Sequence, residues 1–266
     1  MLDHWVVTPP TDQRKRLKQV DTNGKVGLAR TSHWDFRSIL QQRAESVQQF
    51  SLFSGISPED CRTIVASAQE RQFPRGKTIF FQGDPVEQVL LVTSGCIKLS
   101  QLSVDGHEVI LRLVGPGESV SAESCTKCAA HCSTARTLEQ STALVWDGNT
   151  FAAIAERIPE LRRNVWRDLQ LQMNQLEGRY LEVCTQKVEV RLSSELLRLL
   201  EQVGRPSDGH IEVAIPQREL AQLVGTTLFT VSRLLCQWAA KGIVKPRREV
   251  VLVLNAPALA EISKRE

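Results

Sequence analysis

Hydrophobic residues change their spacing along the chain. Between Thr78 and Trp146 they alternate with polar residues in short runs, and glycine- or proline-containing turns separate the runs. The runs are Thr78–Gln82, Val89–Thr93, Ile97–Leu102, Val109–Leu113 and Ala143–Trp146. Alternation is typical of strands with one buried face, and many short strands at close spacing predict an antiparallel β-roll or barrel. Asp105-Gly106, between two of these runs, is a strong hairpin signal.

The next pattern is helical. From Pro159 to Val183 apolar residues recur at intervals of three and four, which predicts a helix of about seven turns with one apolar face. The residues of this stripe are Leu161, Val165, Leu169, Met173, Leu176 and Tyr180. A repeat near 3.5 residues allows two helices to pack along each other. We therefore expect the stripe to form a homodimer interface; packing of the helix on its own domain is the alternative.

A third pattern lies near the C-terminus, where Gly225 separates two short helical segments. Apolar residues fall on one face in Pro216–Val224 and again in Leu228–Leu235. The flanking elements are a helix at Ser193–Glu201, a strand at Ile211–Ala214, and two strands on either side of the basic turn Lys245–Arg248. This order predicts a winged helix-turn-helix.

The charge of this C-terminal region favours DNA as its partner. The whole chain carries a net charge of only +3, yet six basic residues and one acidic residue lie between Ile215 and Arg248. A recognition helix enters the major groove, where an arginine can donate two hydrogen bonds to a guanine. We expect Arg233 and Ser232 to contact bases. The other candidate DNA-binding residues are Phe229, Thr226, Thr227, Arg218, Lys245, Arg247 and Arg248. A plain helical hairpin with surface charges is the alternative.

Length and composition limit the other possibilities. The 266 residues allow two modest domains plus connections, and 42% hydrophobic with 24% charged residues is typical of a globular protein. No apolar run reaches the roughly 18 residues that span a bilayer. No signal peptide is visible, so we expect a cytoplasmic protein that does not contact membranes. Gly-rich phosphate loops, HExxH pairs and nucleophile elbows do not occur, so we do not expect an enzyme.

Five segments match the pattern of a known family: Leu52–Ser57, Phe73–Phe80, Gly83-Asp84, Val92–Gly95 and Gly225–Arg233. In these segments, and over about residues 47–256, the chain resembles the superfamily of the cAMP receptor protein and the fumarate-nitrate reduction regulator (CRP/FNR). The resemblance implies an α+β fold: an effector-sensing β-roll of the cyclic-nucleotide-binding type at 47–158, a dimerisation helix at 159–186 and a winged helix-turn-helix domain at 187–266. We expect residues 1–46 to be a weakly ordered extension. The resemblance also implies a homodimeric transcription regulator that binds promoter DNA and acts with RNA polymerase.

The recognition helix departs from the family pattern at one position. Members that read TGA-type half-sites commonly combine Glu, Ser and Arg, and here Ser232 and Arg233 match while Phe229 stands in place of the Glu. A glutamate accepts a hydrogen bond from cytosine N4, whereas a phenyl ring can at best pack on a thymine methyl group. We expect Arg233 still to read guanine, and the neighbouring base remains open.

The effector pocket departs from the family pattern as well. Members that bind cyclic nucleotides need a Gly-Glu pair for the ribose and an Arg-Ser pair for the phosphate. This sequence has Ser121-Ala122 and His131-Cys132 at those places. Without the arginine the phosphate loses its bidentate partner, so we do not expect cAMP to bind.

Three of the seven cysteines lie in this same stretch, at i, i+3 and i+7: Cys125, Cys128 and Cys132. That spacing puts three sulfurs on one face of a short helix. Clustered thiolates suit an iron–sulfur cluster or zinc, with His131 as a candidate fourth ligand. We expect a redox- or gas-responsive centre here. The alternatives are thiol oxidation without metal, a small-molecule ligand in the roll, and thiols that pack as small hydrophobes.

Overall fold

The structure is a computed structural model that describes residues 33–122, 130–207 and 209–265. The chain divides into two compact units, residues 1–42 and 43–266. Among the described elements, only the first part of helix α1 (His33–Val47) lies in the first unit. The second unit holds the elements that the sequence patterns predicted.

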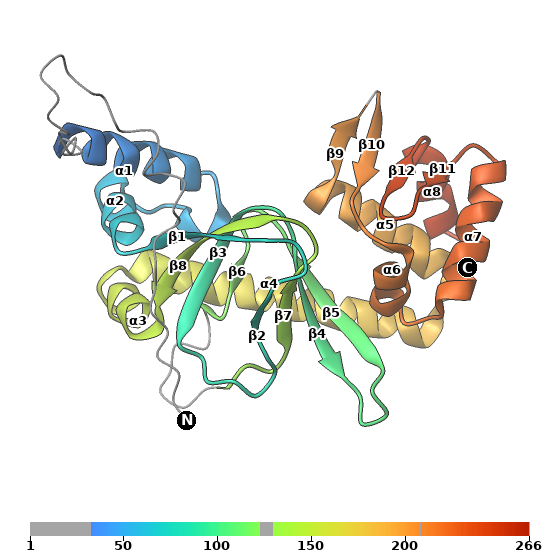
Figure 1. The fold of residues 1–266 in the computed structure, drawn as a ribbon, viewed down its shortest axis with the longest axis horizontal. Helices are drawn as coiled ribbons and strands as arrows, with labels where there is room; N and C mark the ends of the chain where they lie inside the picture. The colour runs from blue at the N-terminus through green and yellow to red at the C-terminus, as the bar shows by residue number, and fades with distance from the viewer. Residues whose placement is uncertain (1–32, 123–129, 208, 266) are drawn as a thin grey trace, which may run out of the picture. The chain divides into compact units, whose positions relative to one another are not determined.

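An antiparallel roll of two four-stranded sheets forms the first half of this unit (Figure 1). One sheet has the strand order β1-β8-β3-β6 and the other β2-β7-β4-β5. The strands are β1 Gln69–Phe73, β2 Thr78–Phe80, β3 Gln88–Ser94, β4 Ile97–Leu102, β5 Glu108–Val114, β6 Ser119–Val120, β7 Thr134–Thr137 and β8 Ser141–Asp147. All five apolar runs singled out in the sequence contain a strand, and the predicted antiparallel roll is confirmed.

Two helices share a core with one sheet of the roll. They are α2 (Pro58–Ala66) and α3 (Gly148–Arg157), and the short 3-10 helix η2 (Ser51–Phe53) precedes α2. Ser57 caps the start of helix α2, because its side chain accepts a hydrogen bond from the backbone N–H of Asp60. Trp146 of β8 is fully buried, and its indole N–H donates to the carbonyl oxygen of Ile64 at 2.8 Å. Its ring meets Phe151 edge to face at 5.6 Å, which joins β8, α2 and α3 in one core.

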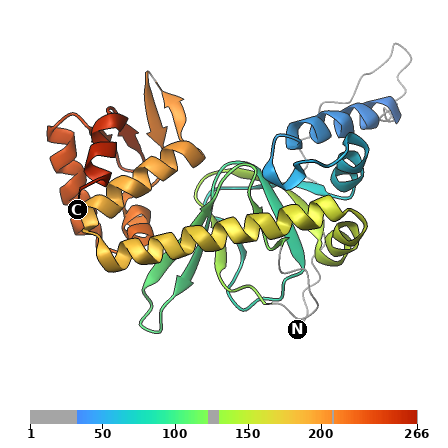
Figure 2. The ribbon, with the colours of Figure 1, turned by 180° about the vertical axis from the view of Figure 1, so that it is seen from behind.

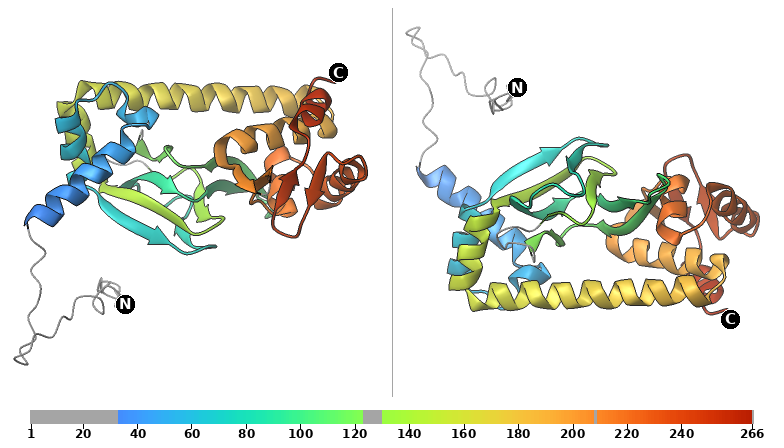
Figure 3. Two further views of the ribbon diagram at one scale, coloured as in Figure 1. Left: turned by 90° about the horizontal axis from the view of Figure 1, so that it is seen from above. Right: turned by 90° about the horizontal axis from the view of Figure 1, so that it is seen from below.

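The long helix α4 (Pro159–Thr185) follows the roll and leads to the C-terminal elements (Figure 2). Figure 3 shows it from two further sides, lying along the sheets. Asn164 fixes its first turns, because the buried amide of Asn164 donates to the carbonyl oxygens of Leu52 at 2.9 Å and Ser54 at 2.8 Å. Leu161 is fully buried, and Val165 packs against the same core. Leu161 is therefore covered within its own chain and Val165 is partly covered, whereas the later residues of the predicted stripe are less buried.

The C-terminal elements form the predicted winged helix-turn-helix. Its small sheet has the order β11-β12-β10-β9, and four helices pack around it. The elements are α5 Val188–Val203, β9 Arg205–Ser207, β10 His210–Val213, α6 Gln217–Val224, α7 Leu228–Ala240, β11 Val244–Pro246, β12 Val251–Val253 and α8 Ala256–Ser263. Helix α5 begins at Val188, five residues before the predicted start at Ser193. None of the helices within the described ranges is long and apolar enough to cross a membrane.

The segment before the roll differs from our expectation. We predicted a weakly ordered extension through residue 46, and the structure instead has helix α1 from His33 to Val47. Ala44 and Val47 near its end are buried in the core that also contains Trp146. The helix was missed because its apolar residues are few and do not form a regular stripe. Residues 1–32, with the basic cluster at 14–18, lie outside the described residues.

Candidate DNA interface and effector pocket

The turn between α6 and α7 depends on Gly225. Its backbone has φ 68° and ψ 51°, in the left-handed region, where a residue with a side chain would be strained. Its N–H donates to the carbonyl oxygen of Ala221 and ends α6. Helix α7 then starts at Thr227, whose side chain accepts a hydrogen bond from the backbone N–H of Thr230 at 3.2 Å. Glycine and threonine thus fix the angle at which α7 leaves the turn.

Helix α7 has one buried and one exposed face. The buried face consists of Val231, Leu234, Leu235 and Trp238. Arg233 and Phe229 are exposed on the other side, one turn apart, and Ser232 beside them is half-buried. The three residues predicted to read bases therefore share the accessible part of one helix.

The remaining candidate contacts also reach the surface. Arg218 on α6 is exposed, and so are Lys245, Arg247 and Arg248 in the wing. The wing turn is closed by the N–H of Arg247, which donates to the carbonyl oxygen of Val250 at 2.7 Å. At the start of α7, Thr227 is exposed and Thr226 is half-buried. Each of these candidate side chains is at least partly exposed to solvent.

Arg191 is a positioning residue that the sequence did not reveal. This buried guanidinium donates to the carbonyl oxygen of Gln186, between α4 and α5, at 2.7 Å. It also donates to the carbonyl oxygen of Val224, at the end of α6, at 3.3 Å. Arg191 therefore ties the link after α4 to the helix that precedes the recognition helix.

In the roll, His131 occupies the place where the resemblance expected a phosphate-binding arginine. Its ring stacks on Phe80, with centroids 3.4 Å apart, and its Nδ1 lies 3.3 Å from Oγ of Ser121. Ser121 has φ 65°, the left-handed conformation that favours glycine. Burial, opposed in part by the carboxylate of Asp84, lowers the pKa of His131. Burial thus disfavours the charged form of this imidazole, so His131 does not offer a phosphate the permanent positive charge of an arginine.

A cavity of about 230 Å³ lies between the roll and α4. Five of its ten lining residues are apolar, and Arg112, Ser133, Gln172, Gln175 and Arg179 add polar groups. Arg112 donates to the carbonyl oxygen of Ser119 at 3.0 Å, which holds its side chain at the wall. The aliphatic lining consists of Leu99, Leu111, Leu169, Met173 and Leu176. Such a cavity suits a small, mostly apolar molecule.

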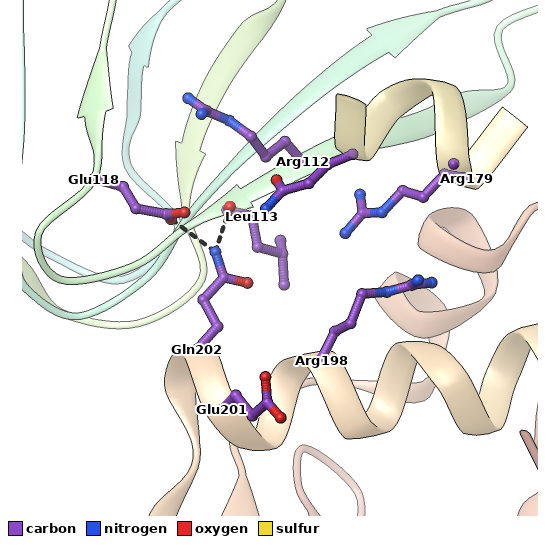
Figure 4. A pocket seen from close by; sticks show the side chains of 9 residues that line it. Arg112, Leu113, Glu118, Arg179, Arg198, Glu201 and Gln202 are labelled. Atoms are coloured by element: carbon purple, nitrogen blue, oxygen red, sulfur yellow. Dashed lines mark hydrogen bonds between the residues drawn. The ribbon is translucent and has the colours of Figure 1, made fainter. Parts of the chain in front are cut away.

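A second cavity, of about 360 Å³, lies where β5, α4 and α5 meet (Figure 4). Gln202 on α5 spans it, with its amide donating to the carbonyl oxygen of Leu113 at 2.9 Å and to the carboxylate of Glu118 at 2.7 Å.

Arg179 and Arg198 also line the cavity. Both arginines already have carboxylate partners: Arg179 pairs with Glu195, and Arg198 with Glu182 and Glu195. The hydrogen bonds that Arg198 donates to the Glu182 carboxylate raise the pKa of Arg198 above its usual value. These ion pairs link the end of α4 to α5.

Lys98 of β4 is a buried cation that the sequence did not reveal. Its ammonium lies 2.8 Å from a carboxylate oxygen of Glu108 and 3.6 Å from one of Glu219, on α6. Gln222 of α6 donates to the same Glu108 carboxylate at 3.1 Å. Burial disfavours the charged form of Glu108, but hydrogen bonds from Lys98 and Ser100 outweigh it, so the pKa of Glu108 is lowered. Charge pairing thus joins the roll to the first helix of the helix-turn-helix.

The predicted cysteine centre falls largely beyond what the structure describes. Cys125 and Cys128 lie outside the described residues, whereas Cys132 is described and exposed. Within residues 33–122, 130–207 and 209–265, no group of three His, Cys, Asp or Glu side chains could hold a metal ion. His131, the candidate fourth ligand, has its Nδ1 toward Ser121 and its ring against Phe80. The described residues therefore do not supply a metal-ligand set.

Comparisons with known proteins agree with this geometry. A family model for the cyclic nucleotide-binding domain matches residues 70–158, and one for the Crp-like helix-turn-helix domain matches residues 190–262. The chain is 31% identical over 212 residues to the Cyclic AMP receptor protein of Thermus thermophilus, covering 80% of this chain and 96% of that protein. It is 31% identical over 199 residues to the Global nitrogen regulator of Synechococcus elongatus, covering 73% of this chain and 89% of that protein.

Solved structures share the fold at lower sequence identity. A CRP/FNR-family transcriptional regulator of Thermus thermophilus superposes with a TM-score of 0.64 at 22% identity, covering 74% of this chain and 99% of that one. FixK2 of Bradyrhizobium japonicum gives a TM-score of 0.65 at 20% identity, covering 75% of this chain and 98% of that one. A roll of the cyclic-nucleotide-binding type, joined by a long helix to a Crp-like helix-turn-helix, defines a class of DNA-binding transcription regulators. The chain belongs to the CRP/FNR family of these regulators.

Proposed function

We propose that the protein binds palindromic promoter DNA as a homodimer and regulates transcription there. The exposed face of α7 carries this proposal, because Arg233 and Ser232 stand on it next to an accessible basic wing. An arginine on such a helix can hold guanine O6 and N7 with two hydrogen bonds. A regulator at a promoter acts on the polymerase that binds there, so RNA polymerase is a further expected partner. We expect all of this to take place in the cytoplasm.

The other candidate residues serve the phosphate backbone in this proposal. The N–H groups at the start of α7 favour an anion, and Thr226 and Thr227 can donate hydroxyl hydrogen bonds to it. The basic side chains that would neutralise phosphates are Arg218, Lys245, Arg247 and Arg248. Phosphate contacts position a protein on DNA without reading its sequence, so these residues supply affinity and Arg233 supplies specificity.

The dimer interface is proposed on the exposed side of α4. Leu161 is buried and Val165 is partly buried, so we leave them out of the predicted stripe and add the exposed Trp166 and Val183. The resulting row still recurs at intervals of three and four. Its residues are Trp166, Leu169, Met173, Leu176, Tyr180 and Val183. Leu169 is half-buried and the other five are exposed, which leaves a large apolar surface uncovered in a single chain. A second copy of α4 packed in parallel would cover it as a two-helix coil.

This arrangement assigns a role to each part of the chain. Residues 47–158 would sense an effector, residues 159–186 would dimerise, and residues 187–266 would bind DNA. An effector that binds more tightly to dimers with one particular spacing of the two recognition helices would increase the population of dimers with that spacing. The ion pairs of Lys98 and Arg198 lie at the junctions that such a shift would change.

For the effector we propose a signal other than cAMP, sensed at Cys125, Cys128 and Cys132. The i, i+3, i+7 spacing and the exposure of Cys132 support a redox- or gas-responsive centre. The test is to purify the protein without oxygen and to assay iron, sulfide and zinc per chain. Iron with sulfide, lost in Cys128→Ser, would support an iron–sulfur cluster, and zinc alone would indicate a structural site. The proposed centre would be refuted if the purified protein contains no metal and if neither oxidants nor the triple Cys→Ser change alters its affinity for DNA.

A small-molecule effector is the second candidate, because the cavity against α4 is on the described part of the chain. Its wall includes Met173 and Leu176, which also belong to the proposed dimer row. A ligand there would contact the roll and the dimerisation helix together. If the triple cysteine variant is unresponsive to oxidant but still regulated in cells, this candidate is favoured.

DNA binding itself is tested by gel shift on duplexes of random sequence. We expect retention that weakens steeply as salt rises, because basic side chains release counterions from the phosphates. Arg233→Ala should retain this nonspecific binding. Absence of any shift at low salt would contradict the proposal.

A further inference from the structure

We propose that Phe229 selects a thymine within two base pairs of the guanine read by Arg233, by packing on the thymine C5-methyl group. This inference rests on the proposed DNA-binding function and adds the base specificity of the same site. A phenyl ring cannot form the hydrogen bonds with which other side chains recognise bases. Phe229 would recognise its base by apolar contact instead.

Phe229 has no structural reason to be apolar. It lies in the first turn of α7 and is 76% exposed, and its neighbour Leu228 is 50% exposed. The domain core is filled instead by Val231, Leu235 and Trp238 from the opposite face. Covering a solvent-exposed phenyl ring with another apolar surface is energetically favourable. The position of Phe229 therefore favours an apolar partner.

Helix α7 offers no carboxylate for the recognition of cytosine. Its sequence from Leu228 to Ala240 contains no acidic residue, and a carboxylate is what accepts a hydrogen bond from cytosine N4. A phenyl ring neither donates nor accepts a conventional hydrogen bond. In the major groove, thymine is the one base that presents a methyl group, so an apolar side chain can distinguish it from the other three.

The spacing of Phe229 and Arg233 limits which base is involved. Four residues of α-helix rise about 6 Å, and successive base pairs are about 3.4 Å apart. Both side chains project from the same exposed face of α7, whose place in the domain is shown in Figure 1. When Arg233 holds a guanine, the ring of Phe229 therefore reaches a base pair within two steps of it.

Deoxyuridine tests this proposal, because it differs from thymidine only by the missing methyl group. The probe is a duplex selected by the protein itself, prepared with thymine or with uracil at the step within two base pairs of the guanine. We expect uracil to weaken binding by the wild-type protein about fourfold, the effect of burying one methyl-sized group. Phe229→Ala should bind both duplexes equally. Phe229→Glu should change the selected base toward cytosine.

Phe81→Ala is the matched control, because Phe81 is an exposed phenylalanine in the roll. It should retain the full preference for thymine over uracil. A selected half-site with no thymine near the guanine would overturn the inference, and so would equal binding of both duplexes by the wild-type protein. A loss in Phe229→Ala that is the same for thymine and uracil would also overturn it, since the preference for thymine would then persist without the phenyl ring. In each case Arg233-dependent binding would leave the proposed function intact, whereas no binding of any duplex would refute the function itself.

Discussion

The imidazole ring of His131 lies parallel to the phenyl ring of Phe80, with 3.4 Å between centroids and 8° between planes. The pair occupies the place where the family resemblance puts the phosphate-binding arginine. We therefore expect millimolar cAMP to leave the melting temperature unchanged. A ligand present at 100 times its dissociation constant would add ~2.7 kcal/mol to the free energy of unfolding. A clear upward shift in differential scanning calorimetry would contradict this expectation.

The dimer interface is tested by a charge on the exposed row of α4. Leu176→Glu would place a carboxylate in an apolar interface, where an unpaired charge is costly, so we expect a monomer. Leu171→Glu is the control, because Leu171 is also exposed on α4 but lies outside the row. Light scattering measures both masses. A dimer in Leu176→Glu, or a monomer in the control, would show that the copies meet elsewhere.

Removing the buried cation at the junction of roll and α6 should destabilise the protein. Lys98→Met leaves the carboxylates of Glu108 and Glu219 without their shared partner, and we expect about 3 kcal/mol less free energy of unfolding in urea. Lys264→Met removes an exposed i, i+3 pair and should cost under about 1 kcal/mol. Equal losses in the two variants would be inconsistent with a buried charge cluster.

The same cluster predicts a dependence on pH. The pKa of Glu108 is lower in the folded protein than its ordinary value of 4.5, so its ionised form stabilises the fold. That contribution is complete above the ordinary pKa and is lost as pH falls through the folded value. Glu108→Gln should therefore flatten the fall in stability below pH 4.5, as followed by urea unfolding at several pH values. An unchanged pH profile would remove Glu108 from this role.

Much of the fold was predictable because its elements carry strong local patterns. The alternating runs identified β2, β3, β4, β5 and β8, and Gly225 marked the end of α6. Strand β1 was missed because Gln69–Gln72 are polar and exposed, and only Phe73 points into the core. The start of α5 was missed as well. The predicted helix began at Ser193, whereas α5 begins at Val188. Contacts between residues far apart in the sequence, such as the ion pair of Lys98 and Glu219, cannot be predicted from local sequence patterns.

The site was predictable only in part, for the same reason. Accessible residues on α7 follow from helix periodicity once Gly225 places the turn. The predicted stripe on α4 included the buried Leu161, because spacing alone does not say which side of α4 faces its own roll. Leu161 and Trp166 both fit an apolar periodicity, and only the packing of Leu161 against the roll separates them. The partner of His131 was likewise invisible, since Phe80 lies 51 positions earlier in the sequence.

Base contacts and phosphate contacts should respond differently to mutation. Arg233→Ala should cost about 1–3 kcal/mol on the selected site and relax one base position. Lys245→Ala should weaken all sequences alike and reduce the slope of log affinity against log salt by about one. Fluorescence anisotropy titrations at several salt concentrations, on the selected site and on a scrambled one, measure both effects. An Arg233→Ala loss that is equal on the two duplexes would assign Arg233 to the backbone.

Selection from a random pool of duplex DNA tests the central claim most directly. Two copies of α7 related by a two-fold axis, each with Arg233 in a major groove, predict an inverted repeat with a guanine in each half-site. The half-site centres should lie about one helical turn, roughly 10 base pairs, apart. Sequencing the bound fraction should recover that repeat, and Arg233→Ala should lose the guanine. Enrichment of a single unpaired motif, or of no motif at all, would contradict a dimeric, sequence-specific regulator.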